Sequence, residues 1–208
     1  MENYLKGTTC VGLVCKDGIV LAAEKRASMG SLVVHKEAVK IYKIDNYVGA
    51  TIAGLVADAQ RLIRLLKAET QLYKVTRGES MKVEAMATLL ANIMFSQRWF
   101  PYISQLLVGG IDNEGKHLFA ISFTGDIIED NMIATGSGSP IAYGILEGLY
   151  KEDLTVEEGK KLAVKAVKAA TERDVFSGEG IDVVVINEGG YNKLSKEEIK
   201  KIVEGPVA

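Results

Sequence analysis

The chain of 208 residues has few of the residue types that mark specialised proteins: two cysteines, three prolines, two histidines and one tryptophan. Cys10 and Cys15 lie five apart in one expected strand, so their side chains point to opposite faces and cannot pair with each other. Without a Cys-x-x-Cys spacing or a larger set of cysteines, we expect neither a structural zinc site nor a secreted disulfide scaffold. Two buried free thiols in a reducing compartment fit this pattern.

Long apolar runs are also missing. No run reaches the roughly 18 residues of a membrane helix, and residues 1–7 carry no apolar stretch typical of a signal peptide. The chain has 25 lysines and arginines and 27 acidic residues, so its net charge is −2. This small negative charge produces no strong electrostatic attraction to nucleic acid or anionic lipid. We therefore expect a cytoplasmic protein that binds neither nucleic acid nor a membrane.

Two histidines are too few for a His-rich metal site. His35 and His117 lie in no HExxH or other ligand-spaced context, so we expect no catalytic metal. No Gly-x-Ser-x-Gly elbow marks a nucleophilic serine. Gly136-Ser137-Gly138 resembles a phosphate-binding turn, but no Lys-Ser/Thr follows it. Metal catalysis, imidazole-dependent hydrolysis and nucleotide binding are therefore disfavoured, and we expect no cofactor.

The composition is typical of one globular domain, because 48% of the residues are hydrophobic and 25% are charged. Strand-forming runs surround the turns Asp17-Gly18 and Asp45-Asn46, and we expect both hairpins in the same sheet. A second block of strands follows over residues 104–135, and a last strand covers 181–186.

Helical periodicity marks two blocks. Residues 55–76 keep apolar side chains at near-helical spacing, and Ser80 is the expected N-cap of a second helix. Capping boxes that begin at Thr155 and Ser195 open two later helices, and an apolar helix over 141–150 precedes them. Strands and helices thus alternate in blocks, which predicts an α+β fold: a four-layer α-β-β-α sandwich of two antiparallel sheets.

One other kind of nucleophile remains. When the chain is cleaved just before a threonine, that threonine becomes the first residue and its own α-amine serves as the base. Gly7-Thr8-Thr9 is a place where such a cut could fall. The tripeptide alone carries little weight, because Gly-Thr is common at strand starts.

Longer motifs, in the same order, resemble those of archaeal-type proteasome β subunits. They are KGTTCVGLVCKDGIVLAAEKRASMG, HKEAVKIYKID, TIAGLVADAQ, FPYISQLLVGGID, ATGSGSPIAYGILE and ERDVFSGEGIDVVVI. The resemblance runs from Gly7 to about Ile186. It implies an N-terminal-nucleophile hydrolase with the sandwich fold and the activity of a threonine endopeptidase. Residues 1–7 would be a propeptide and residues 8–208 a single domain.

The resemblance also implies the reacting groups. Thr8 would be the nucleophile, released by self-cleavage after Gly7. Glu24 in AAEKR and Lys40 in KEAVKIY match the family's charged pair beside that threonine, and the Lys40 cation would disfavour the protonated amine. Gly54 would present the backbone N–H that stabilises the tetrahedral oxyanion.

Further site residues follow from the same motifs. Ser137, Asp174 and Ser177 match the set that orients the threonine amine and passes protons by way of water, and Thr9 is expected to be supportive. The substrate pocket would be lined by Ala27, Ser28, Ala38, Tyr42, Ile52 and Val56. These small and apolar walls favour cleavage after hydrophobic residues, while backbone pairing of an extended peptide would explain broad sequence tolerance.

The resemblance implies partners as well. We expect homo-heptameric β rings stacked on rings of a related α subunit, unfolded polypeptides as substrates and an ATPase unfoldase that feeds them through the α ring. A mixed ring with a second β subunit stays open. The alternative function is an unprocessed, structural or regulatory β subunit, because no free threonine amine exists while residues 1–7 remain attached.

Overall fold

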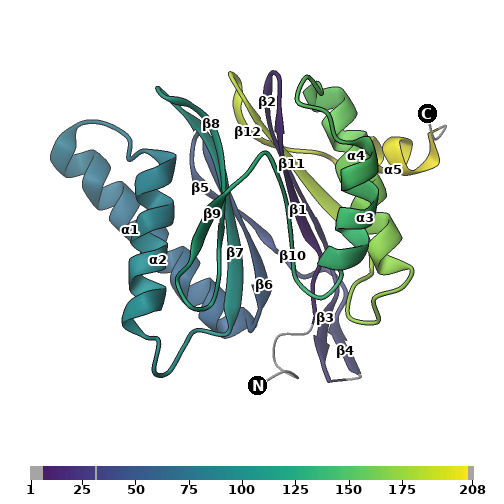
Figure 1. The fold of residues 1–208 in the computed structure, drawn as a ribbon, viewed down its shortest axis with the longest axis horizontal. Helices are drawn as coiled ribbons and strands as arrows, with labels where there is room; N and C mark the ends of the chain where they lie inside the picture. Colours follow the sequence, from purple (N-terminus) through teal and green to yellow (C-terminus); the bar gives the residue numbers. More distant parts are fainter. Residues whose placement is uncertain (1–6, 31, 206–208) are drawn as a thin grey trace.

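The chain folds into four layers, with two β-sheets face to face between two layers of helices (Figure 1). The computed structural model describes residues 7–30 and 32–205, and residues 1–6 of the expected propeptide lie outside them. Every strand pairing among the described residues is antiparallel. The α-β-β-α sandwich of antiparallel sheets predicted from the order of blocks is therefore confirmed.

The first sheet has the strand order β10-β1-β2-β11-β12. Its strands are β1 (Cys10–Cys15), β2 (Gly18–Glu24), β10 (Met132–Thr135), β11 (Ile181–Asn187) and β12 (Gly190–Lys193). All of β2 is buried, because β1 and β11 flank it and α4 (Val156–Thr171) packs over it. A continuous apolar run is what a strand covered on both faces requires.

The second sheet has the strand order β5-β6-β7-β8-β9. Its strands are β5 (Ile41–Asp45), β6 (Val48–Gly54), β7 (Ser104–Asp112), β8 (Gly115–Ile121) and β9 (Ile127–Glu129). The prediction that the hairpin around Asp45-Asn46 extends the first sheet is therefore wrong. With β1 and β11 on its two sides, β2 leaves no free edge, and the chain crosses to the other sheet through a small hairpin, β3 (Ala27–Met29) and β4 (Leu32–His35).

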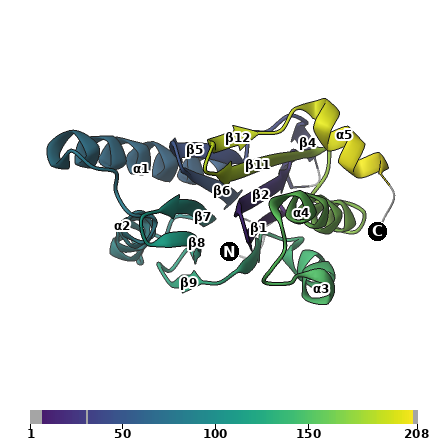
Figure 2. The same cartoon turned by 90° about the horizontal axis from the view of Figure 1, so that it is seen from above.

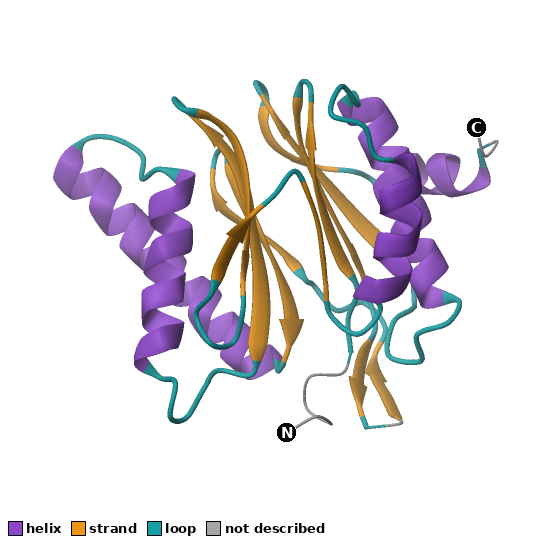
Figure 3. Ribbon diagram, in the orientation of Figure 1, coloured by secondary structure: helices purple, strands orange, loops and turns teal. Residues whose placement is uncertain are grey.

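Two pairs of helices cover the outer faces of the sheets, as the view from above shows (Figure 2). The remaining helices are α1 (Val56–Arg77), α2 (Val83–Ser96), α3 (Ser139–Leu149) and α5 (Lys196–Glu204). Helices α1 and α2 pack on the second sheet, whereas α3 and α4 pack on the first (Figure 3). Both predicted capping boxes are confirmed, with the Thr155 and Ser195 hydroxyls accepting from Glu158 and Glu198 N–H groups.

The start of α2 differs from the sequence prediction. The N-cap is Lys82 rather than Ser80, and its side chain makes no capping hydrogen bond. A carboxylate from the end of β7 replaces it, because Asp112 Oδ2 accepts from Val83 N at 2.9 Å. An acceptor supplied by tertiary structure satisfies the orphan N–H as well as a local cap does.

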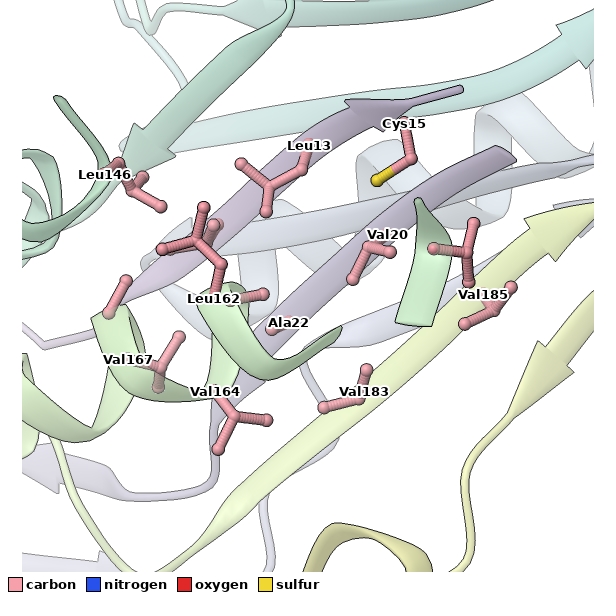
Figure 4. Packing of buried hydrophobic residues seen from close by; sticks show 14 of the residues in the cluster. Leu13, Cys15, Val20, Ala22, Leu146, Leu162, Val164, Val167, Val183 and Val185 are labelled. Carbon is pink, nitrogen blue, oxygen red and sulfur yellow. The ribbon is translucent and has the colours of Figure 1, made fainter. Parts of the chain in front are cut away.

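Three apolar layers hold the sandwich together, one under each helix pair and one between the sheets. The first contains Leu13 of β1 and Val183 of β11 together with Leu162 and Val164 of α4 (Figure 4). Cys15 faces this layer and Cys10 faces the layer between the sheets, so the two thiols are buried on opposite faces as predicted. Within the described residues no helix is both long and apolar enough to span a membrane.

Glycines let the two sheets approach each other. A Cβ on Gly12 of β1 would lie 2.7 Å from Leu118 Cδ1 of β8, and one on Gly109 of β7 would lie 3.1 Å from Ile19 Cγ2 of β2. Both distances are too short for ordinary packing, so the spacing between the sheets depends on Gly12 and Gly109 having no side chain.

We expect Gly12→Val to lower the free energy of unfolding by about 1–3 kcal/mol, because the added methyl groups overpack the inter-sheet layer. Urea unfolding of the isolated chain measures this change. The matched control is Gly144→Ala in α3, where a Cβ meets nothing within 4 Å. That variant should gain about 0.5–1 kcal/mol from helix propensity. Equal stability of the two variants would contradict the account.

Candidate active site

Thr8 lies just before β1, and only 3% of it is exposed. The loop after β10 fixes its backbone, since Gly138 N donates to Thr8 O at 3.4 Å. Gly136 in that loop has a φ of 89°, and a Cβ there would lie 2.1 Å from Thr8 O. Only glycine fits at this position, which explains why a glycine turn stands opposite the threonine.

The peptide bond before Thr8 faces a lysine. Lys40 Nζ donates to Thr8 Oγ1 at 2.9 Å and to Gly7 O at 3.4 Å. Thr8 Oγ1 also contacts Gly7 O, and Gly7 has a φ of 135°, which side chains disfavour. One ammonium group therefore touches both the hydroxyl and the carbonyl of the Gly7–Thr8 junction.

Lys40 forms a buried ion pair with Glu24 Oε1, and the two residues are 5% and 0% exposed. The other oxygen, Glu24 Oε2, accepts from Arg26 N at 2.7 Å and Gly178 N at 2.9 Å. Burial raises the pKa of the Glu24 carboxyl, while the Lys40 ammonium and the two N–H groups oppose that rise. The carboxylate thus holds the ammonium against Thr8 and offsets the cost of its burial.

A second polar group meets the backbone nitrogen of Thr8. Thr8 N donates to Ser137 Oγ at 3.4 Å, and Ser137 Oγ donates to Asp174 Oδ2 at 2.6 Å. Ser177 Oγ donates to the same carboxylate oxygen, also at 2.6 Å. Asp174 follows α4, where its N–H donates to Ala170 O. The end of α4 therefore brings an acidic group to the nitrogen side of Thr8.

Thr9, expected only to be supportive, takes part in this hydrogen-bonded group. It is fully buried, and its Oγ1 lies 2.7 Å from Ser177 Oγ. Ser177 already uses its single proton on Asp174, so the Thr9 hydroxyl is the donor between the two.

A cavity of about 450 Å³ opens beside Thr8. Gly54 ends β6 at its rim with a φ of 109°, and a Cβ there would lie 2.4 Å from Ile103 O. Glycine is therefore required at this position of the rim. All six residues expected to line the substrate pocket border this cavity: Ala27, Ser28, Ala38, Tyr42, Ile52 and Val56.

Sequence reasoning missed part of the cavity wall. The wall also includes Arg26, Val34, His35, Glu37, Val39 and Gln60. Val34 and His35 belong to the β3–β4 hairpin, which the sequence did not predict. The sequence carried two local signals for it: the pair Gly30-Ser31, which is typical of a two-residue hairpin loop, and the short β-branched run before Glu37.

The nearest thiol is a poor rival to Thr8 as a nucleophile. Burial raises the pKa of Cys10 to about 12, and its Sγ donates to Ile52 O at 3.4 Å inside the inter-sheet layer. A neutral, enclosed thiol does not reach the cavity. Among the residues that the structure describes, no group of three or more His, Cys, Asp or Glu side chains is arranged to hold a metal ion.

Comparisons with known proteins show which family the chain belongs to. The model of a family described as "Proteasome subunit" matches residues 4–186. "Proteasome subunit beta" of Methanosarcina barkeri is 52% identical over 202 residues, which cover 97% of this chain and 96% of the relative. "Proteasome subunit beta" of Archaeoglobus profundus is 54% identical over 203 residues, which cover 97% and 94%. The chain therefore belongs to the proteasome subunit family, as an archaeal-type β subunit.

Proposed function

We propose that Thr8 is the nucleophile of this subunit and that it becomes active when the Gly7–Thr8 bond is cut. The chain is a threonine endopeptidase subunit of the proteasome core. The observation that carries the assignment to Thr8 is the position of Lys40 Nζ, 2.9 Å from Thr8 Oγ1 and 3.4 Å from Gly7 O. An ammonium there lowers the energy of a hydroxyl oxygen that loses its proton and of a carbonyl oxygen that gains charge.

The first reaction is self-cleavage. Thr8 Oγ1 attacks the carbonyl carbon of Gly7, and its proton passes to the Thr8 nitrogen as the C–N bond breaks. The product is an ester between Gly7 and Thr8 Oγ1 with a free α-amine. Water then hydrolyses the ester, which releases residues 1–7 with a carboxyl group on Gly7 and restores the Thr8 hydroxyl.

The second reaction is peptide hydrolysis with the same groups. The free amine of Thr8 takes the hydroxyl proton while Oγ1 attacks the substrate carbonyl, and Gly54 N–H stabilises the resulting oxyanion. The amine then gives its proton to the leaving nitrogen, and water hydrolyses the acyl ester. Ser137, Asp174 and Ser177 keep the amine oriented, which is the role that the hydrogen bond from Thr8 N to Ser137 supports.

The cavity supports cleavage after hydrophobic residues. Ala27, Ala38, Ile52 and Val56 offer small or apolar walls, and Tyr42 OH is occupied by Val39 O at 3.0 Å. A long apolar side chain would displace water from these walls without leaving a polar group unpaired.

The subunit assembles into the 20S core together with α subunits. We propose a β ring of seven subunits, with or without a second β subunit, stacked on α rings in the cytoplasm. Unfolded polypeptides are the proposed substrates, and an ATPase unfoldase would supply them through the α ring. Enclosure suits a protease whose recognition relies on main-chain hydrogen bonds, because these discriminate little between proteins. An unprocessed structural subunit is the less favoured alternative.

We expect Thr8→Ala to abolish both reactions, since no hydroxyl remains to attack either carbonyl. Intact-mass spectrometry of particles co-assembled with α subunits should show residues 1–7 retained, and peptide hydrolysis should fall to the uncatalysed rate. The control is Thr76→Ala on the exposed side of α1, which should be processed and active like the wild type. Normal processing of the Thr8 variant would overturn the assignment. Retention of residues 1–7 in assembled wild-type particles would instead favour the structural alternative.

We expect Lys40→Met to slow both reactions by at least about a hundredfold, the lower end for removal of a proton-transfer or charge-stabilising group. Two forms separate the reactions: the full chain, followed by mass, and a chain produced with Thr8 already first, followed by peptide hydrolysis. Because the single change leaves Glu24 buried without its partner, Lys40→Met/Glu24→Gln serves as the control for folding. Activity near that of the wild type in either folded variant would contradict the proposed mechanism.

A further inference from the structure

A second charged group, from the residue after β2, contacts the cavity wall at Glu37. Lys25 directly follows Glu24, the last residue of β2. Lys25 is only 8% exposed. Its Nζ forms an ion pair with Glu37 and lies 4.0 Å from Asp182 Oδ1, and Asp182 is itself 6% exposed.

The backbone of Lys25 joins two functional segments. Lys25 N donates to Gly178 O at 3.1 Å, next to Ser177. Lys25 O accepts from Ala38 N at 2.9 Å. Main chain and side chain therefore both connect Lys25 to residues 36–40, the segment that links β4 to β5.

Residues 36–40 form one side of the cavity, to which Glu37, Ala38, Val39 and Lys40 contribute. The Lys40 end has its own anchors, because Ile52 N donates to Lys40 O at 3.0 Å and Glu24 holds the ammonium. The part at Glu37 and Ala38 is instead held by Lys25, with Lys196 Nζ of α5 3.4 Å from the other Glu37 oxygen. The two halves of the segment thus have separate supports.

The Lys25–Glu37 ion pair also holds the segment at Glu37 in place. A buried ammonium requires an acidic partner, and Asp182 at 4.0 Å is already in contact with Lys193 Nζ at 2.8 Å. The hydrogen bond from Lys25 lowers the pKa of the Glu37 carboxyl and so favours its charged form.

We propose that Lys25 is a positioning residue for substrate binding: its ion pair with Glu37 fixes the Ala38 wall of the cavity, while Lys40 and the chemistry at Thr8 are held independently. The inference rests on the proposed function of that cavity as the substrate pocket. Loosening of this wall should raise KM, because it weakens binding of the substrate side chain before the scissile bond. It should leave kcat nearly unchanged, because the reacting groups stay in place.

The test compares steady-state kinetics of processed, assembled particles on fluorogenic peptides with leucine or tyrosine before the reporter. We expect Lys25→Met, which keeps the apolar stem, to raise KM at least fivefold and to change kcat less than twofold. Lys25→Arg should restore KM to within twofold of the wild type. The matched control is Lys193→Met, which removes the other cation at Asp182 without touching the wall and should leave both constants within twofold.

Two further arms distinguish positioning from a general loss of structure. Glu37→Gln alters a half-exposed side chain and should raise KM as Lys25→Met does, whereas the double variant should be no worse than either single variant. Inhibition by methylboronic acid, which reaches Thr8 Oγ1 without filling the cavity, should stay within twofold of the wild type. Partial unfolding would instead lower kcat in proportion to the inactive fraction and leave KM unchanged.

The proposal is overturned if KM in folded Lys25→Met stays within twofold of the wild type, or if kcat falls and KM does not. If Lys25→Met does not assemble, Glu37→Gln decides in the same way. Failure of the proposed function has a different signature, because Thr8→Ala would then remain active. In that case amide hydrogen exchange of residues 36–40 tests the contact alone: at least tenfold faster exchange in Lys25→Met supports it, and unchanged exchange overturns it.

Discussion

The buried ion pair between Lys40 and Glu24 is the interaction on which the site depends. Both groups are almost completely removed from water, and such a pair contributes little to folding by itself, because desolvation offsets most of its attraction. The three apolar layers of the sandwich supply the folding stability that allows the protein to contain this buried pair. The pair instead fixes an ammonium against the Thr8 hydroxyl, in surroundings that screen charge less than bulk water does.

The two-sheet architecture explains how these residues meet. Glu24 ends a strand of the first sheet, whereas Lys40 precedes a strand of the second, and Thr8 precedes β1 of the first. The chain crosses between the sheets through β3, β4 and residues 36–40, and the crossing itself becomes the cavity wall. A site built at this junction draws its rigidity from both sheets, and Lys25 joins the crossing segment to the end of β2.

Local signals predicted local structure well, and failures arose where distant groups intervene. The capping boxes at Thr155 and Ser195 are complete within four residues, so the sequence alone predicted them. The start of α2 depends on Asp112, about thirty positions away, and the sheet joined by the Asp45-Asn46 hairpin depends on which strand edges are free. The site residues came from family motifs, and the structure gathers them around one threonine. Lys25 was missed because a lysine after a strand normally indicates a solvated end.

The polarity of the hydrogen bonds around Asp174 links the uncut chain to the proposed mature one. Ser137 and Ser177 each have one proton and donate it to Asp174 Oδ2, so Ser137 can only accept at Thr8 N. In the uncut chain that nitrogen is an amide donor. After cleavage it would be an amine, which can keep donating one hydrogen to Ser137 while its lone pair faces the hydroxyl proton. The same fixed acceptor therefore suits both forms of Thr8, and the proposed self-cleavage needs no rearrangement of the residues proposed to orient the amine.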